Sequence, residues 1–200
     1  DENLKNTDKT ILYYSADTED EKLAEHVRET ILKNKGNLPL ISVTQKPHPE
    51  FGENVCVGVH DNCYANEFRQ IQIGLEKVKT KYVIVAEADT LYPPDYFNFA
   101  KLEPGHLYRY DNVWVAFSDN QSYFFKNFSE TSQILETERW LTELNNLFPD
   151  KNKWFSKNDV VTLPKFKRTE SGFTWTGSPV VTFKTGNGVR RLTNYKRSIP

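Results

Sequence analysis

Two carboxylates stand close together in the segment Glu87-Ala88-Asp89, directly after the apolar run of residues 82–86. Such a run is typical of a strand that is buried on both faces of a parallel sheet. Ligands of open α/β sheets bind beyond the carboxyl ends of the strands, which is where these acids stand. Two neighbouring carboxylates repel each other and are costly to desolvate unless a cation accompanies them.

A divalent cation would remove this repulsion. Mg²⁺ and Mn²⁺ prefer oxygen ligands and are usually held by one or two carboxylates together with the phosphates of a substrate. Such an ion neutralises the charge that develops on a diphosphate leaving group. We therefore predict Glu87 and Asp89 as ligands of Mn²⁺ or Mg²⁺. The alternative is that Asp89 forms a turn before Pro93 and Pro94 while Glu87 is solvated.

The elements that must position these acids alternate between strands and helices. We expect strands at residues 10–14, 38–43, 55–59 and 82–86, and a helix over residues 62–79. A further helix should begin near Thr18, which matches a capping box with Glu21. Because a strand–helix–strand order joins parallel strands by right-handed crossovers, the pattern predicts a mostly parallel α/β sheet flanked by helices.

The pattern is less regular beyond residue 100. Strands are expected at residues 107–110, 113–117 and 122–128, and a helix over residues 132–148. No run approaches the roughly 20 apolar residues that span a bilayer, and nothing near the first residue is typical of a signal peptide. Cys56 and Cys63 lack the second ligand pair of a zinc site and are interpreted as reduced thiols.

Charge is divided unevenly along the chain. Residues 1–150 hold 15 Lys and Arg against 25 Asp and Glu, whereas residues 151–200 hold 11 against 2. We expect one domain, with a core over residues 1–150 and a basic extension over residues 151–200 that packs on it. A basic segment suits an anionic partner. The alternatives are that it packs on the acidic body of its own domain or is simply solvated.

Three segments carry a resemblance to a known family. Residues 68–76, 81–89 and 91–97 read FRQIQIGLE, KYVIVAEAD and LYPPDYF. In this order they resemble the core of GT-A-type glycosyltransferases of the family 2-like group, in particular its small bacterial and phage-type members. The resemblance covers about residues 10–145. It implies a GT-A-like, Rossmann-type sheet with an irregular basic C-terminal region, in a cytoplasmic protein (of the host cytoplasm if phage-encoded).

The resemblance also implies a substrate and a set of donor contacts. The enzyme would move a hexosyl or pentosyl group from a nucleotide-diphosphate donor, a UDP-sugar in the first place, to an acceptor hydroxyl. The nucleoside would lie near Ser15 and Asp17, and the diphosphate would reach the metal at Asp89. Arg69 is a further donor contact, since a guanidinium suits phosphate oxygens; the alternative is a surface residue paired with an acid.

One departure from the family concerns the metal. In that group a His near the C-terminus completes the metal shell, but Thr185 stands in the matching place here. Metal binding would then be weaker, or Lys184 would supply positive charge to the diphosphate directly, or activity would be lost.

An inverting transferase needs a carboxylate to accept the proton of the acceptor hydroxyl. Glu136 and Glu138 lie in the region where the resemblance places such a group, and Asp111, in the turn after residue 110, is another candidate. Each of the two glutamates is also explained as a solvent-facing helix residue. If none of the three serves, a retaining mechanism stays open.

The last prediction from sequence concerns the acceptor. Arg190, Arg191 and Trp175 belong to a tail in which basic and aromatic residues alternate. Basic side chains bind phosphates and rings stack on bases, so we predict an anionic acceptor, with hydroxylated bases in DNA as the boldest candidate. A polysaccharide or lipid-linked acceptor is the conventional one. Two other functions stay open: a metal-dependent phosphoryl-transfer enzyme or nuclease, and a non-catalytic domain that binds a nucleotide sugar or nucleic acid.

Overall fold

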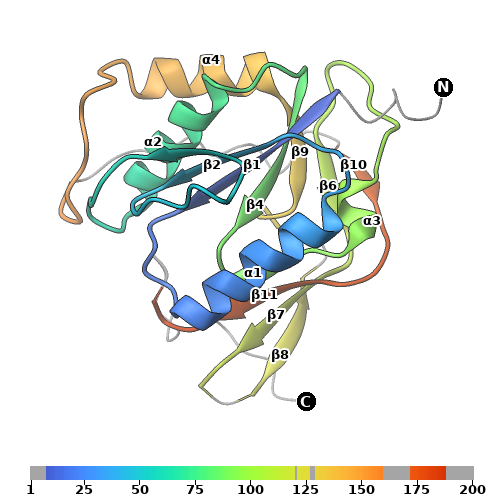
Figure 1. Cartoon of the computed structure of the whole chain (residues 1–200). Coiled ribbons are helices and arrows are strands. Elements are labelled where there is room, and N and C mark those ends of the chain that lie inside the picture. Colours follow the sequence, from blue (N-terminus) through green and yellow to red (C-terminus); the bar gives the residue numbers. More distant parts are fainter. Residues whose placement is uncertain (1–7, 120, 127–128, 160–171, 188–200) are drawn as a thin grey trace.

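A computed structural model describes residues 8–119, 121–126, 129–159 and 172–187 of the chain (Figure 1). Its strands are β1 (Lys9–Ser15), β2 (Leu40–Thr44), β3 (Glu53–Cys56), β4 (Tyr82–Glu87), β5 (Thr90–Leu91), β6 (Tyr108–Tyr110), β7 (Val113–Phe117), β8 (Tyr123–Lys126), β9 (Gln133–Glu136), β10 (Phe173–Trp175) and β11 (Val180–Lys184). Its helices are α1 (Glu21–Asn34), α2 (Tyr64–Leu75), α3 (Pro94–Phe97) and α4 (Thr137–Leu147).

The strands form two sheets. The larger one has seven strands in the order β10-β6-β9-β4-β1-β2-β3, and the smaller one has four in the order β5-β11-β7-β8. In the larger sheet β3, β2, β1 and β4 are parallel neighbours, β10 is parallel to β6, and β9 runs antiparallel to both β4 and β6. The mostly parallel α/β sheet predicted from the sequence is confirmed.

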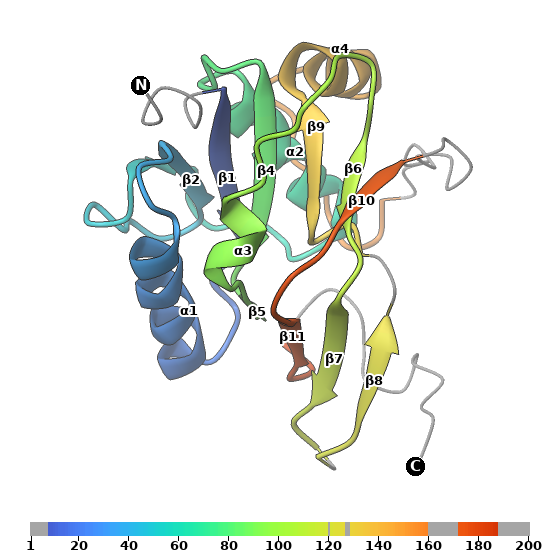
Figure 2. The same cartoon turned by 90° about the vertical axis from the view of Figure 1, so that its right-hand side faces the viewer.

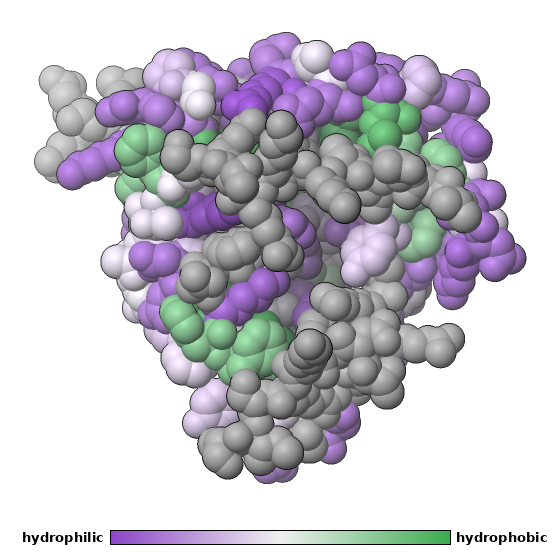
Figure 3. Space-filling view, turned by 180° about the vertical axis from the view of Figure 1, so that it is seen from behind, coloured by the Kyte–Doolittle hydropathy of each residue, from purple (hydrophilic) through white to green (hydrophobic). Residues whose placement is uncertain are grey.

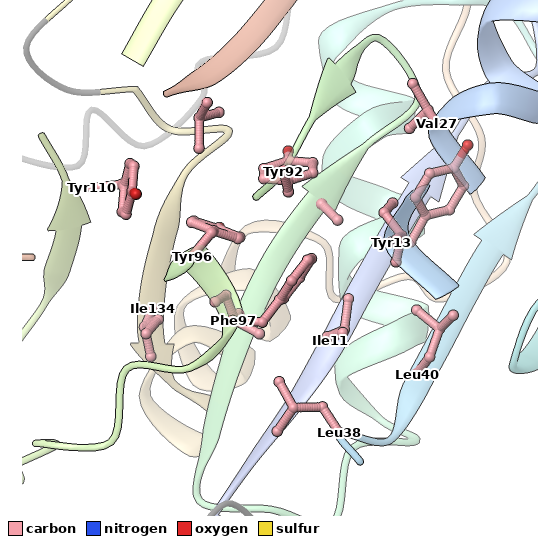
Figure 4. Close-up of a cluster of buried hydrophobic side chains, with 14 of the residues drawn as sticks. Ile11, Tyr13, Val27, Leu38, Leu40, Tyr92, Tyr96, Phe97, Tyr110 and Ile134 are labelled. Carbon is pink, nitrogen blue, oxygen red and sulfur yellow. The ribbon is translucent and has the colours of Figure 1, made fainter. Parts of the chain in front are cut away.

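Helices cover both faces of the larger sheet, α1 and α3 on one side and α2 and α4 on the other (Figure 2). Side chains along β1 alternate between these faces: Ile11 and Tyr13 contact the α1 side, whereas Leu12 and Tyr14 contact the α2 side. Figure 4 shows the first of these cores, in which aromatic rings of the α3 region gather against the strands. The central strands are therefore buried on both faces, as their apolar sequences predict.

The structure corrects two sequence predictions about helices. Helix α1 begins at Glu21, with the side chain of Asp20 accepting a hydrogen bond from the Leu23 amide, and not at the Thr18 capping box. The helix predicted over residues 132–148 starts only at Thr137, because residues 133–136 form β9. Short apolar pairs fit the helix and the strand period equally well, so sequence alone does not separate them.

The region that the sequence marked as irregular contributes to both sheets. Strand β10 extends the larger sheet beside β6, and β11 lies between β5 and β7 in the smaller one. Trp175, predicted to contact the acceptor, is 6% exposed and stacks on Tyr96 and Phe99 in the core. That prediction is wrong, because the ring belongs to the aromatic cluster under α3.

Polar residues predominate over much of the face turned away from the viewer of Figure 1, and apolar residues gather on it in separate patches (Figure 3). Within the described ranges, no helix is long and apolar enough to cross a membrane.

Candidate active site

The acidic turn lies where the two sheets meet. Glu87 ends β4 and stands beside Tyr14 of the parallel neighbour β1, so both residues lie at the carboxyl edge of the larger sheet. The chain then turns through Asp89 into β5, which belongs to the smaller sheet (Figure 2). Open α/β sheets bind ligands at this edge.

Each of the two acids has partners. The Tyr14 hydroxyl donates to Glu87 Oε1 at 2.7 Å. Lys184 Nζ lies 2.8 Å from Asp89 Oδ2, and the Thr90 hydroxyl donates to Asp89 Oδ1 at 3.0 Å. Asp89 is 8% exposed, so this ion pair is largely withdrawn from water.

Strand β11 places the lysine. Thr182 pairs with Thr90 in the antiparallel ladder between β11 and β5, and the two hydroxyls are 3.1 Å apart. The Phe183 amide donates to the Asp89 carbonyl at 2.7 Å. Because the backbone of the turn is tied to the residue before Lys184, the ammonium group is held against the carboxylate.

Further carboxylates surround this pair. Desolvation, followed by the charges of Glu87 and Asp89, holds the pKa of Glu67 well above its usual range. Desolvation and the charge of Asp89 raise the pKa of Glu87 to about 7. Desolvation also raises the pKa of Glu19, whose carboxylate accepts a hydrogen bond from the Thr185 hydroxyl at 2.6 Å. Four acids thus share one electrostatic environment with Lys184.

A pocket of about 270 Å³ opens at the same edge of the larger sheet. It lies in the loops after β1, β2 and β3 and is lined by Ala16, Asp17, Thr18, Gln45, Lys46, Val59, His60, Asp61, Asn62 and Lys157. The His60 imidazole is stacked on Trp154, with ring centroids 3.6 Å apart. The Asn62 amide donates to Thr18 Oγ1 and to the Asn187 carbonyl, both at 3.1 Å, which joins the pocket to the segment after β11.

Gln45 is a buried polar residue that lines the pocket. It is 5% exposed, and its side-chain oxygen accepts a hydrogen bond from the His60 amide at 3.0 Å. Its side-chain nitrogen has no hydrogen-bond partner among the described residues. A buried donor without a partner is costly, and a ligand that offers an acceptor would satisfy it.

Ser15 and Asp17 shape the loop after β1. The Asp17 backbone has a positive φ of 53°, and its amide donates to Ser15 Oγ at 2.9 Å. The Asp17 carboxylate accepts from the Lys46 amide at 2.7 Å and lies 3.0 Å from His48 Nε2. These contacts tie the loops after β1 and β2 together, so Asp17 lines the pocket with both its oxygens already engaged.

Helix α2 holds the carboxyl edge of the larger sheet in place. Gln70 donates through its side-chain amide to the carbonyls of Ser15 and Val43, at 2.8 and 3.0 Å, and so holds the ends of β1 and β2. A Cβ at Gly74 would lie 2.3 Å from Leu12 Cδ1. The missing side chain at Gly74 therefore lets the helix lie close to the side chains of β1 and β2.

Arg69 lies away from the pocket opening. It is 4% exposed, and its guanidinium donates to Gln72 Oε1 at 2.6 Å and to the Lys151 carbonyl. It also lies 5.9 Å from the centre of the Trp154 ring, which in turn stacks on His60. These contacts hold Arg69 beside Trp154, and its role as a donor contact stays a prediction from sequence.

The predicted catalytic bases are divided between the two edges of the sheet. Glu136 pairs with Tyr82 at the start of β4, and the Thr137 amide that follows donates to the Lys81 carbonyl at 2.9 Å. Glu136 and the exposed Glu138 therefore lie at the opposite edge from Glu87, about 17 Å away along the strand. Strand β9 runs back along the sheet before α4, so neither glutamate stands beside the acidic turn, and their role as bases stays a prediction from sequence.

Asp111 does lie at the acidic edge. Strand β6 is antiparallel to β9 and therefore runs in the same direction as β4. Asp111 follows β6 directly, so it stands at the same edge as Glu87. Arg190 and Arg191 lie outside the described residues.

Sequence reasoning missed several members of this site. Glu19, Glu67, Gln45 and His60 come from separate loops and from α2, with no shared motif. A weak signal existed for Glu67, an acid in the first turn of a helix that leads to the acidic strand.

The residues present fit a divalent cation poorly. Both Asp89 oxygens already accept bonds, one of them from a cation, and Glu87 Oε1 accepts from Tyr14. In the described part of the chain, no three His, Cys, Asp or Glu residues converge in a way that could hold a metal ion. We therefore derive no step through a metal, and Mn²⁺ or Mg²⁺ binding stays a prediction from sequence.

Comparison with known proteins shows the fold. No family model and no curated protein sequence matches the chain. The inositol-1-phosphate CTP transferase from T. maritima is similar with a TM-score of 0.50 and 11% identity, over 90% of this chain and 90% of that one. S. aureus TarS 1-349 in complex with UDP-GlcNAc has a TM-score of 0.50 and 8% identity, over 96% of this chain and 62% of that one.

A third similar structure is the bifunctional IspDF from Campylobacter jejuni, with a TM-score of 0.45 and 10% identity. The match covers 94% of this chain but only 52% of IspDF, so the chain spans about half the length of that protein. At such identities the two likenesses with a TM-score of 0.50 describe architecture alone: a mixed α/β sheet of the GT-A-like, Rossmann-type class, as the sequence predicts.

The acidic cluster yields a prediction about stability. The pKa of Glu67 is higher in the folded chain than in the unfolded one. The folded chain therefore binds more protons between these two values, and stability falls as the pH rises through that window. Glu67→Gln should raise Tm at pH 8 by about 2–4 °C, the shift expected for about 1 kcal/mol at this size.

This gain should shrink as the pH falls toward 4, because Glu67 then becomes protonated in the unfolded chain as well. Thermal melts of the two proteins from pH 4 to pH 8 measure it. Glu25→Gln, at an exposed position of α1, is the matched control and should show no such trend. A Tm difference for Glu67→Gln that does not change with pH would contradict the shared electrostatic environment.

Proposed function

We propose that the chain is a glycosyltransferase that uses a nucleotide-diphosphate sugar, in the first place a UDP-sugar. One observation carries the proposal: a pocket of about 270 Å³ opens in the loops at the carboxyl edge of the sheet, and Glu19, the residue after its lining residue Thr18, accepts a hydrogen bond from Thr185, which follows Lys184. The pocket has room for a nucleoside, and the ammonium group of Lys184 suits phosphate. The likeness to TarS in complex with UDP-GlcNAc supports the proposal at the level of the fold.

The pocket suits a nucleoside for two reasons. The unpartnered Gln45 nitrogen offers a hydrogen bond to a base carbonyl or ring nitrogen. His60 lines the pocket, and its ring is stacked on Trp154, which gives the pocket an aromatic side. With the base in this pocket, the diphosphate extends past the loop of Thr18 toward Lys184.

In this assignment the acceptor oxygen forms a bond to C1 of the sugar while the C1–O bond to the diphosphate breaks. The electron pair of the broken bond stays on the diphosphate, and the hydroxyl proton passes to a carboxylate. Asp111 is the member of the predicted base set that lies at this edge. Glu130, an exposed acid in the loop before β9, is a second carboxylate there, and its charge acts on Glu67.

A nucleotidyltransferase is the second candidate. The inositol-1-phosphate CTP transferase from T. maritima matches this chain over 90% of both lengths. Such an enzyme would bind a nucleoside triphosphate in the same pocket, so the two functions differ in the nucleotide that binds. The alternatives of a nuclease and of a non-catalytic nucleotide-sugar- or nucleic-acid-binding domain need either nucleic acid cleavage or donor binding without turnover.

A ligand panel tests the donor class. Nucleoside diphosphates and UDP-sugars should raise Tm, because a ligand at 100 times its Kd stabilises the folded state by about 2.7 kcal/mol. Thermal shift with UDP, CDP, GDP, ADP, CTP and UDP-GlcNAc, each with and without Mn²⁺, measures this. Stabilisation by CTP alone would favour nucleotidyl transfer, and no stabilisation by any of these compounds would refute the proposal.

Two carboxylates test the location of the base. Asp111→Asn should lower the rate of sugar transfer or donor hydrolysis about 10²- to 10⁴-fold, the usual contribution of a general base. Glu138→Gln should retain the wild-type rate, because its side chain is exposed at the opposite edge. Steady-state assays of both variants, with circular dichroism to check folding, decide it. Equal rates for Asp111→Asn and wild type would transfer the role to another carboxylate.

The acceptor is a finer part of the proposal. Residues 151–200 hold 11 Lys and Arg against 2 Asp and Glu, which favours an anionic acceptor such as hydroxylated bases in DNA. Binding to duplex DNA should weaken steeply with salt, and the Arg190→Ala/Arg191→Ala double variant should flatten that slope by about 1 unit per lost contact. Fluorescence anisotropy at several salt concentrations measures the slope. Absence of binding at low salt would remove DNA from the list.

A further inference from the structure

Lys184 occupies the position at which a cation beside Asp89 is expected. Its ammonium group lies 2.8 Å from Asp89 Oδ2, with 22% of the lysine side chain and 12% of the aspartate side chain exposed. This is a partly buried ion pair at the site itself. A cation therefore belongs to the chain at this point, and it needs no recruitment from solution.

The lysine is held from several sides. It pairs with Phe117 in the parallel ladder between β11 and β7, and its carbonyl accepts the amide and the hydroxyl of Ser118, both at 3.1 Å. The residue before it is tied to the Asp89 carbonyl at 2.7 Å. Fixed groups of this kind stabilise developing charge without reorganisation during the reaction.

Asp89 is not arranged to take a second cation. Its Oδ1 accepts the Thr90 hydroxyl at 3.0 Å and its Oδ2 faces the ammonium group. A divalent ion on either oxygen would lie close to a like charge, which is repulsive. The carboxylate is instead placed to orient the ammonium group of Lys184.

We propose that Lys184 is the cation that neutralises the diphosphate, and that donor binding by this chain therefore needs no divalent metal. The inference rests on the proposed function. An ammonium group has three N–H donors, so it can bind Asp89 and a phosphate oxygen at the same time. When the C1–O bond of the donor breaks, its electron pair stays on the diphosphate oxygen and Lys184 stabilises that charge. Asp89 acts as a positioning residue.

Nucleotide binding with and without metal tests this. Isothermal titration of the whole chain with UDP, CDP, GDP and ADP is carried out once in EDTA and once in Mn²⁺. Wild type should bind the same nucleotide under both conditions, with affinities within about 3-fold, a difference below 1 kcal/mol. Lys184→Gln should lose about 10- to 100-fold in EDTA, the usual worth of a charged hydrogen bond.

Two variants and one spectrum complete the experiment. Lys184→Arg should retain binding in EDTA, since it keeps the charge, and Lys33→Gln on the exposed side of α1 controls for the change in net charge. Lys184→Gln frees Asp89 Oδ2, so added Mn²⁺ should restore part of its binding. In electron paramagnetic resonance, Mn²⁺ mixed with the wild-type protein should keep the signal of the free ion.

The failures are distinguishable. Wild type that binds a nucleotide only in Mn²⁺, or that quenches the free-ion signal, overturns this inference and leaves the transferase proposal intact. The inference is also overturned if the Lys184→Gln variant is folded, as judged by circular dichroism, and binds the nucleotide in EDTA with wild-type affinity. If no nucleotide binds in EDTA or in Mn²⁺, the proposed function fails and this inference fails with it.

Discussion

The ion pair between Asp89 and Lys184 joins the two sheets of this fold. Asp89 follows the central strand β4, and Lys184 ends β11 of the smaller sheet, 2.8 Å away. Removing two charges from water is costly, and the attraction repays that cost only when the geometry and the additional hydrogen bonds are good. The Thr90 hydroxyl and the Phe183 amide supply those bonds at the turn. The turn that leads into the smaller sheet and the electrostatics of the site therefore share this contact.

Neighbouring residues hold further acidic side chains at the carboxyl edge of the larger sheet. Tyr14 donates to Glu87, while Glu67 approaches from α2 with its pKa raised by desolvation and by the charges of Glu87 and Asp89. Neither arrangement is the most stable choice for a sheet edge, because buried like charges oppose folding. Helix α2 fixes the edge through Gln70, and Gly74 lets the helix lie close to β1. Support of this kind keeps the polar side chains of a functional site in fixed positions.

Features that depend on residues close together in the sequence could be predicted, whereas features that depend on tertiary contacts could not. The strand 82–86, its two acids and the parallel order of the first strands are local patterns, and the structure confirms the strand order. Residues 133–136 were predicted as helix because Ile134 and Leu135 fit either period, whereas they form β9, which places Glu136 at the opposite edge from Glu87. Gln45, His60 and Glu67 were missed because only tertiary packing brings their loops together.

Contacts in the structure explain part of the charge difference between residues 1–150 and residues 151–200. In the described part of the basic segment, Lys184 pairs with Asp89 and Lys151 pairs with Glu76, so both bind acids of residues 1–150. The Lys157 backbone amide adds a bond to Asp61 at the pocket rim. Part of the positive charge thus balances the acidic body of its own domain, which was one of the alternatives that the sequence left open. An anionic ligand at this edge would share the ammonium group with Asp89, so its affinity depends on how well Lys184 can bind both at once.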